Sequence, residues 1–425
     1  MITAFANIWK VPELRDRILF TLAMVVIVRL GVAITLPGVD ASVIDRWLEW
    51  RGENDEGGNA IGGLLNVFSG GALQQCGIFA LGIMPYISAS IMMQLMSAVV
   101  PTLAKLRREE GGQQKINQYT RFITIVIAVV QGFLLAQTLQ NPENIPYMEG
   151  ISQHGGGDLV PEGGGGFVAL TVLTILAGTM FLMWIGDQIT ERGIGNGISL
   201  IISVNIIAAL PGALVQAFNT YVQGAEDNPF KPMVLVGLFA LLLVIIAAVI
   251  AITQAQRRIA IQYAKRVRGK QLTGQQTQYL PLKVNYSGVM PIIFASAILS
   301  LPTMLLSSIP AFGDKAWVGW LTTNLNPPSI PYFVISAAMI FFFSYFWVAT
   351  MFQPSEVAEN LKRSGGYVPG VRPGKPTADF LDFTMTRLTF AGALFLTMIY
   401  ILPMLLTVAL DLNFVVTSFF GGTSL

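Results

Sequence analysis

Residue types that could carry out chemistry are few in this chain of 425 residues. It has one histidine, His154, in a glycine-rich stretch, and one cysteine, Cys76. The sequence contains no zinc-protease, serine-hydrolase, phosphate-loop or calcium-loop motif. Because most metal sites need several converging ligands, a solvated role for His154 is favoured over metal binding. A small apolar role is likewise favoured for Cys76 over redox chemistry. We therefore expect no enzyme activity, no metal and no cofactor.

A second candidate for a functional site is the glycine pattern Gly193, Gly195 and Gly197 within ERGIGNG. It partly resembles a dinucleotide-binding turn, but that turn requires a strand–helix–strand context. Here the glycines open an apolar run, so a tight turn and a helix start are favoured.

The chemistry that remains lies within long apolar runs. Arg29 stands out as an ionisable residue there, and a structural cation and a contact to a partner helix are both open roles for it. The amides of Gln94, Gln131 and Asn205 are also polar groups within apolar runs. Hydrogen bonding between helices is favoured for them over lining water.

Two isoleucines, Ile83 and Ile87, lie one helical turn apart on either side of Pro85. Branched apolar side chains at a bend could form a hydrophobic constriction that blocks ions and water. On the residues alone, packing or lipid contact is the more common role of such side chains.

Composition indicates the kind of protein that holds these residues. The chain is 53% hydrophobic and 12% charged, against about 25% charged residues in an average soluble protein. Its apolar runs are of membrane-spanning length, and the first contains Arg29 and does not resemble a cleaved signal peptide. The sequence predicts an all-α polytopic membrane protein, with spans near 18–36, 76–100, 120–139, 167–185, 196–215, 233–252, 287–306, 332–352 and 388–408.

The charges of the connecting loops alternate. The N-terminus and the loops 101–119, 253–286 and 353–387 are basic, whereas the intervening loops are acidic. The positive-inside rule then places the N-terminus and the basic loops in the cytoplasm. The acidic stretches 51–60 and 150–166 are expected to be solvated connectors, and the glycine-rich second one to be mobile.

The basic loops have patterns of their own. Segments 257–264 and 278–284 predict a protruding hairpin with a basic tip. The sequence SEVAENLKRS predicts a short helix with a Glu359–Arg363 pair, followed by an extended segment. These loops are too long and too patterned for simple connectors, so we expect docking surfaces.

Between residues 61 and 101, a short glycine-rich piece precedes a membrane-length run that contains Gly82 and Pro85. Half-length backbone at membrane depth is tolerated only where protein or a water-filled cavity surrounds it. This stretch therefore indicates an aqueous interior with a small element in it.

Several long motifs resemble the bacterial SecY family, the large subunits of the Sec protein-conducting channel. The resemblance covers nearly the whole chain and is carried by FSGGAL (68–73), FALGIMPYISASI (79–91), GTMFLMWIGDQITERGIGNGIS (178–199), LPLKVN (280–285) and the pattern around LKRSG and RPG (360–377). It implies a ten-helix clamshell of two inverted five-helix halves, 1–215 and 216–425. The tenth helix is expected to be incomplete at Leu425.

The resemblance also implies roles for particular residues. A pore ring would comprise Ile83, Ile87, Ile202 and Ile293. A plug near 61–73 would include Gly62, Leu64, Leu65, Phe68, Ser69, Gly70 and Gly71. The lateral gate would include Ser88 and Gln131. The docking surface for a motor or a ribosome would comprise Arg257, Arg258, Lys265, Arg266, Arg268, Lys270 and Arg372.

The function that the resemblance implies is passage of unfolded secretory polypeptides across the bacterial cytoplasmic membrane, with lateral release of membrane segments into lipid. Expected partners are the small subunits SecE and SecG, the SecA ATPase, the ribosome and signal-bearing preproteins, with no direct nucleic-acid specificity. A secondary transporter for small solutes is the alternative, because broken helices and inverted repeats occur there too. A membrane-embedded enzyme is a more distant one.

Overall fold

The computed structural model describes residues 11–54, 69–109, 111–140, 142, 151–222, 231–263, 267–268, 271–272, 277–296, 298–299, 316–325 and 329–410. The chain divides into two compact units. The first comprises Met1–Asp227, Pro302–Pro327 and Asn413–Val416, and the second comprises Asn228–Leu301, Pro328–Leu412 and Thr417–Leu425.

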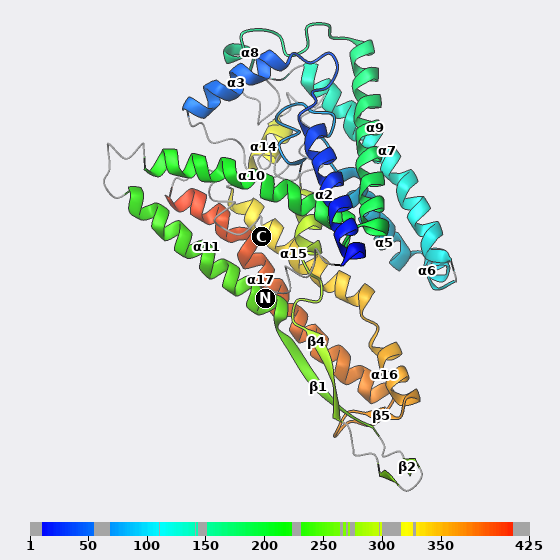
Figure 1. The fold of residues 1–425 in the computed structure, drawn as a ribbon. Coiled ribbons are helices and arrows are strands. Elements are labelled where there is room, and N and C mark those ends of the chain that lie inside the picture. Colours follow the sequence, from blue (N-terminus) through cyan, green and yellow to red (C-terminus); the bar gives the residue numbers. More distant parts are fainter. Residues whose placement is uncertain are drawn as a thin grey trace. The chain divides into compact units, whose positions relative to one another are not determined.

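The first unit is helical in its described part (Figure 1). Its helices are α2 (Pro12–Val32), α3 (Ala41–Asn54), α5 (Met84–Val99), α6 (Pro101–Arg108), α7 (Gly112–Gln140), α8 (Ile151–His154), α9 (Gly165–Arg192), α10 (Gly197–Tyr221) and α14 (Ala316–Asn324). Helix α7 packs against both α5 and α9, and α9 also contacts α2 and α10. The long helices thus form a bundle around α9.

The second unit combines long helices with a small sheet. Its elements are α11 (Lys231–Gln254), β1 (Gln256–Tyr263), β2 (Val267–Arg268), β3 (Gln271–Leu272), β4 (Thr277–Lys283), α15 (Ile330–Met351), α16 (Pro354–Arg363), β5 (Gly366–Tyr367) and α17 (Lys375–Leu410). Helices α15 and α17 pack together, and α16 packs on α17.

The prediction of a polytopic α-helical membrane protein is confirmed. Five described helical stretches are long and apolar enough to cross a membrane: Gly112–Gln140, Gly165–Arg192, Met233–Gln254, Ile330–Arg363 and Lys375–Leu402. A sixth arises if Met84–Ser97 and Pro101–Arg107, which are bent by 104°, count as one span. Large apolar side chains such as Phe122, Val126 and Leu173 are exposed on the helices, as expected where lipid is the solvent.

The prediction that 76–100 forms one membrane-spanning helix is wrong for the first part of that range, which is not helical. Residues 70–83 form turns, and α5 begins at Met84 with Pro85 in its first turn. Proline starts a helix there without loss, because the first N–H groups of a helix have no partner within it. Cys76 and Gly82 have φ values of 47° and 55°, in the left-handed region that a helix excludes.

The turn segment, residues 70–83, pairs with the stretch that follows α2. The N–H of Leu36 donates to the carbonyl oxygen of Cys76 at 2.8 Å, and that of Ile78 donates to Ile34 at 2.9 Å. The ring of Phe79 lies so close to α2 that a Cβ added at Gly31 would lie 2.0 Å from it. The turns are therefore held by backbone pairing with the stretch after α2 and by close packing against α2 itself.

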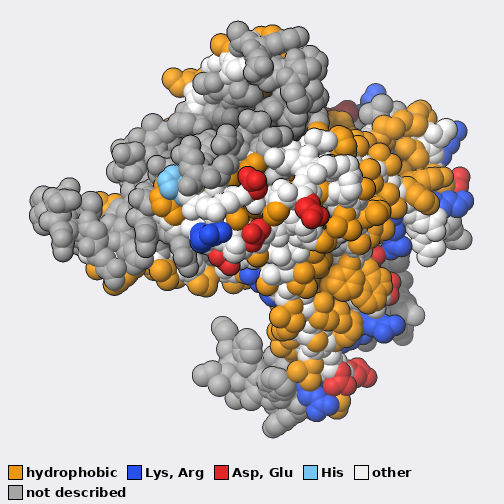
Figure 2. All heavy atoms as spheres, turned by 90° about the horizontal axis from the view of Figure 1, so that it is seen from above, with side chains coloured by type: hydrophobic (Ala, Val, Ile, Leu, Met, Phe, Trp, Pro, Cys, Tyr) orange, Lys and Arg blue, Asp and Glu red, His pale blue; other side chains and the backbone are white. Residues whose placement is uncertain are grey.

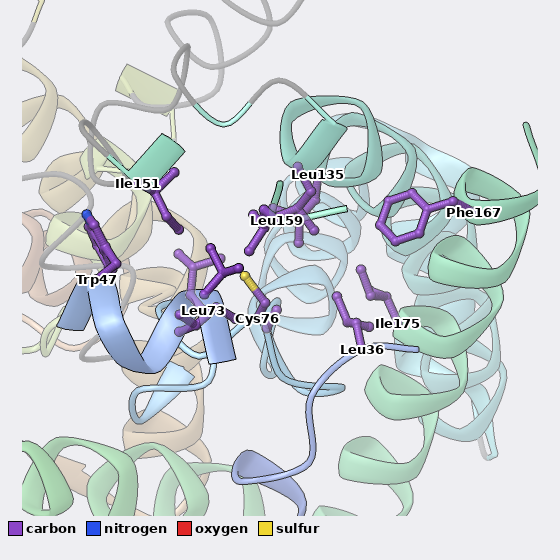
Figure 3. Close-up of a cluster of buried hydrophobic side chains, with 13 residues drawn as sticks. Leu36, Trp47, Leu73, Cys76, Leu135, Ile151, Leu159, Phe167 and Ile175 are labelled. Atoms are coloured by element: carbon purple, nitrogen blue, oxygen red, sulfur yellow. The ribbon is translucent and has the colours of Figure 1, made fainter. Parts of the chain in front are cut away.

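The expectation that 150–166 is a solvated connector holds for residues 161–166, which are exposed, but is wrong for Ile151 and Leu159. Ile151 and Leu159 are buried in a cluster that also contains Trp47, Leu73 and Cys76 (Figure 3). A Cβ at Gly155 would lie 2.6 Å from the Val43 side chain, so glycine here permits close approach of α8 to α3. Isolated apolar residues among the glycines thus make this stretch, with α3, a packed cover over the turn segment.

Residues 51–54 of the other expected connector, 51–60, belong to α3, and the remainder lies outside the described residues. His154 is exposed, as predicted, and its ring stacks on Trp50 at 3.7 Å between centroids. In a view from above, several acidic side chains lie near one another beside a broad hydrophobic area (Figure 2). Asp45, Asp158 and Glu162 of the first unit are all exposed.

Candidate pore and docking site

Three of the four predicted ring isoleucines belong to the first unit. Ile83 is the residue immediately before α5, and its carbonyl oxygen accepts the N–H of Ile87 at 3.1 Å. The side chains of Ile83 and Ile87 are 3% and 8% exposed. Ile202 lies in the second turn of α10 and is half-buried. The start of α5 therefore places two branched apolar side chains one turn apart, and α10 supplies the third.

The fourth ring residue, Ile293, belongs to the second unit. It is half-buried within a helical stretch, where its N–H donates to Val289 and its carbonyl oxygen accepts from the Ser296 hydroxyl at 3.0 Å. The shared role of the four isoleucines in one ring stays a prediction.

The end of the predicted plug is within the described part of the chain, whereas Gly62, Leu64, Leu65 and Phe68 lie outside it. Ser69 is buried, and its hydroxyl accepts the N–H of Leu73 at 3.1 Å. The guanidinium of Arg29 donates to the carbonyl oxygen of Gly70 at 2.9 Å. Gly71 has a φ of 95°. The plug end is thus a tight turn in contact with α2.

The predicted gate residues lie on neighbouring helices. Ser88 is half-buried on α5, and Gln131 is half-buried on α7, which packs against α5. The side-chain oxygen of Gln131 is buried and has no hydrogen-bond partner among the described residues. Such an oxygen is costly in an apolar environment unless a partner satisfies it. A gate role for both residues stays a prediction.

The predicted hairpin is confirmed and is part of a larger sheet. Strands β1 and β4 pair antiparallel with Ile259 opposite Leu280, and β5 pairs with the other edge of β1. The Tyr367 hydroxyl donates to the side-chain oxygen of Gln262 at 3.1 Å across the second pairing. The basic loops 253–286 and 353–387 therefore form one body, which extends away from α11 (Figure 1).

One hydrophobic core supports this body. It comprises Ile259, Leu282, Val348, Phe352, Val368, Leu381 and Met385, contributed by β1, β4, α15, the segment after β5 and α17. The predicted short helix is α16, with an ion pair of 2.6 Å between Arg363 and Glu359. We call β1, β4, β5, α16 and the first turns of α17 the strand platform.

The platform places the described basic residues on its surface. Arg257 and Arg258 are exposed on β1, and Arg372 is exposed in the turn before α17. The backbone of that turn is held by a hydrogen bond of 2.9 Å from the Thr377 hydroxyl to the Arg372 carbonyl oxygen. Arg268 lies in β2, and Lys265, Arg266 and Lys270 lie outside the described residues. A docking role for all seven stays a prediction.

Sequence reasoning missed two polar contacts. One is the hydrogen bond from Arg29 to Gly70, for which the only sequence signal was a cation within an apolar run. The other is the 2.6 Å ion pair between Arg121 of α7 and Asp187 of α9. Both connect segments far apart in the sequence, and local patterns do not encode such pairings.

The whole chain is similar to known proteins. The family model for SecY matches residues 77–425. The protein translocase subunit SecY of Escherichia coli K12 is 44% identical over 418 residues, which cover 97% of this chain and 88% of that protein.

Solved structures agree in fold. A SecY structure, described as having a plug domain that stabilises the closed state of the translocation channel, has a TM-score of 0.60 at 14% identity. Sec61 from a canine ribosome–channel complex of the endoplasmic reticulum has a TM-score of 0.56 at 13% identity. Each match covers 96% of this chain and 90% of the other. The chain belongs to the SecY family.

Proposed function

We propose that this chain is the central subunit of a protein translocation channel. It passes unfolded secretory polypeptides across the cytoplasmic membrane and releases membrane segments sideways into lipid. The observation that carries the proposal is the 44% identity to a protein translocase subunit over 97% of the chain. The chain itself is a conduit and not an enzyme.

The seal of the idle channel is proposed to have two parts. Ile83, Ile87, Ile202 and Ile293 form an apolar gasket, because branched apolar side chains at a constriction exclude ions and water. The segment near 61–73 is the plug, and at its described end the Gly70 carbonyl oxygen accepts from Arg29 and the Ser69 hydroxyl accepts from Leu73.

Energy for transport comes from partners in this proposal. The strand platform presents Arg257, Arg258 and Arg372 on one rigid body. Exposed guanidinium groups attract acidic and phosphate-bearing surfaces and accelerate encounter with them. We assign this body to docking of the SecA ATPase or the ribosome, and we assign SecE and SecG as the small subunits. The N-terminus and the platform lie in the cytoplasm, as the loop charges predict.

The membrane exit is proposed to run beside α5 and α7, at Ser88 and Gln131. The buried oxygen of Gln131 supports this choice, because a polar atom that lacks a partner in the packed state can gain one when helices separate. Replacing Gln131 with leucine is therefore expected to favour the closed gate and to slow membrane insertion.

The test is reconstitution of the chain with SecE and SecG in lipid vesicles. With SecA and ATP, a signal-bearing preprotein should become protected from added protease, and the same preprotein without its signal should not. Glycine at the four ring positions should raise ion leak through the idle complex. Absence of signal-dependent protection would refute the function, and an unchanged leak would refute the gasket.

A further inference from the structure

We infer that Arg29 is a positioning residue that holds the plug in the closed channel through the backbone of Gly70. This inference rests on the proposed function, because it concerns the plug of that channel. Three residues carry it: Arg29 on α2, Gly70 at the plug end and Asn205 on α10. We call them the plug anchor.

The first observation is the contact itself. The Arg29 guanidinium donates to the Gly70 carbonyl oxygen at 2.9 Å in a part-buried setting. Hydrogen bonds with an ionised donor are about twice as strong as neutral ones. A cation in an apolar span is costly unless it is satisfied, so the same contact stabilises Arg29 and the turn.

The second observation is the fit around Gly70. Its φ is 69°, and a Cβ added there would lie 2.7 Å from Arg29 Nη1 and 2.7 Å from Asn205 Oδ1. Those distances are shorter than real Cβ contacts, so an alanine at this position would push the ends of the Arg29 and Asn205 side chains away from the turn. Glycine is favoured by the left-handed backbone, and it lets both polar groups approach closely.

The third observation is where Asn205 lies. It is buried on α10, three residues after Ile202, and residues three apart share one face of a helix. The plug anchor thus includes a residue of α10, and this residue lies one helical turn from the proposed ring residue Ile202. Within the first unit, one polar side chain of α2 and one of α10 therefore lie beside Gly70.

The consequence is a defined opening step. Displacing the plug end breaks the bond between Arg29 and the Gly70 carbonyl and separates Gly70 from Asn205. Farther along the turn segment, the Cys76 carbonyl oxygen still accepts the N–H of Leu36, and the N–H of Ile78 still donates to Ile34. Arg29 therefore sets how often the idle plug opens, while the chemistry of transport remains with the partners.

The experiment measures resting ion conductance of the complex with SecE and SecG in planar bilayers, beside its rate of preprotein translocation. Arg29→Met removes the donors and keeps an unbranched apolar stem. We expect resting conductance to rise about tenfold, which corresponds to about 1.4 kcal/mol. Arg29→Lys, which keeps a charged donor, should restore part of the seal. Translocation by both variants should persist.

A glycine pair provides the matched control. Gly70 and Gly71 both have left-handed φ values, but a Cβ at Gly71 would meet nothing within 4 Å. Gly70→Ala should therefore leak, and Gly71→Ala should leak less, although the φ of 95° at Gly71 strains an alanine at least as much as the φ of 69° at Gly70. Equal leak from both alanine variants would overturn the anchor, as would a wild-type seal in Arg29→Met. Failure of the natural chain to translocate would instead overturn the proposed function.

Discussion

The strand platform allows one prediction to be worked out from the structure. Leu381 is 0% exposed and lies in the core shared by Ile259 and Leu282. Leu381→Ala removes three carbon atoms from a site where helix α17 and two strands meet. Such leucine-to-alanine changes in cores cost about 2–5 kcal/mol, because they lose burial and leave a cavity.

This loss of stability can be measured as a larger population of the open platform. Since each 1.4 kcal/mol is a factor of ten, a loss of about 2 kcal/mol raises the population of the open platform about 25-fold. Amide hydrogens of β1 exchange with solvent through such openings. Hydrogen–deuterium exchange of peptides that cover Gln256–Tyr263 should therefore accelerate by at least that factor in detergent.

The matched control is Leu394→Ala on the same helix. Leu394 is exposed, so its truncation leaves no cavity, and exchange in β1 should remain that of the natural chain. If Leu381→Ala accelerates exchange in β1 no more than Leu394→Ala does, the sheet does not depend on this core. The assignment of both basic loops to one rigid body would then be refuted.

Three further predictions concern other parts of the chain. Gly31→Ala places a Cβ 2.0 Å from the Phe79 ring, so thermal unfolding of the complex should show a loss of about 1–3 kcal/mol, as is typical of overpacking. Arg257→Glu should weaken SecA or ribosome binding more at low salt than at high salt, because screening removes the repulsion; salt-independent binding would contradict this. Hydrogen bonds from the hydroxyl and N–H of Ser42, with smaller help from Arg46, lower the pKa of Asp40. Since the folded pKa is the lower one, its support for the start of α3 is present above the unfolded pKa and is lost as pH falls through the folded value. Trp50 fluorescence should report that loss in acid.

The local features of the second unit could be predicted from the sequence. Alternation around Ile259 and Ile261 predicts β1, and the Glu359–Arg363 spacing predicts α16. The pairing of β5 with β1 could not be predicted, because it joins residues more than a hundred positions apart through backbone groups. Strand pairing of that kind depends on tertiary packing that a short window does not contain.

The turn segment shows a different limit of prediction from hydropathy. Residues 76–83 are as apolar as a membrane helix, so hydropathy alone extends the span across them. Their conformation is decided by Pro85 at the helix start and by the backbone pairing of Cys76 and Ile78 with the stretch that follows α2. Likewise, Ile83 and Ile87 look like ordinary packing residues in composition, and the family resemblance alone supplied their proposed role.

The central claim is that a polypeptide passes the ring isoleucines, and site-specific crosslinking tests it most directly. A photoreactive amino acid is placed at Ile87 and, as a control, at Val126, which is exposed on α7. A preprotein is then stalled in the reconstituted channel by a folded domain at its C-terminus. We expect light to join the stalled chain to position 87 and not to position 126. Crosslinking at position 126 but not at position 87 would contradict the conduit.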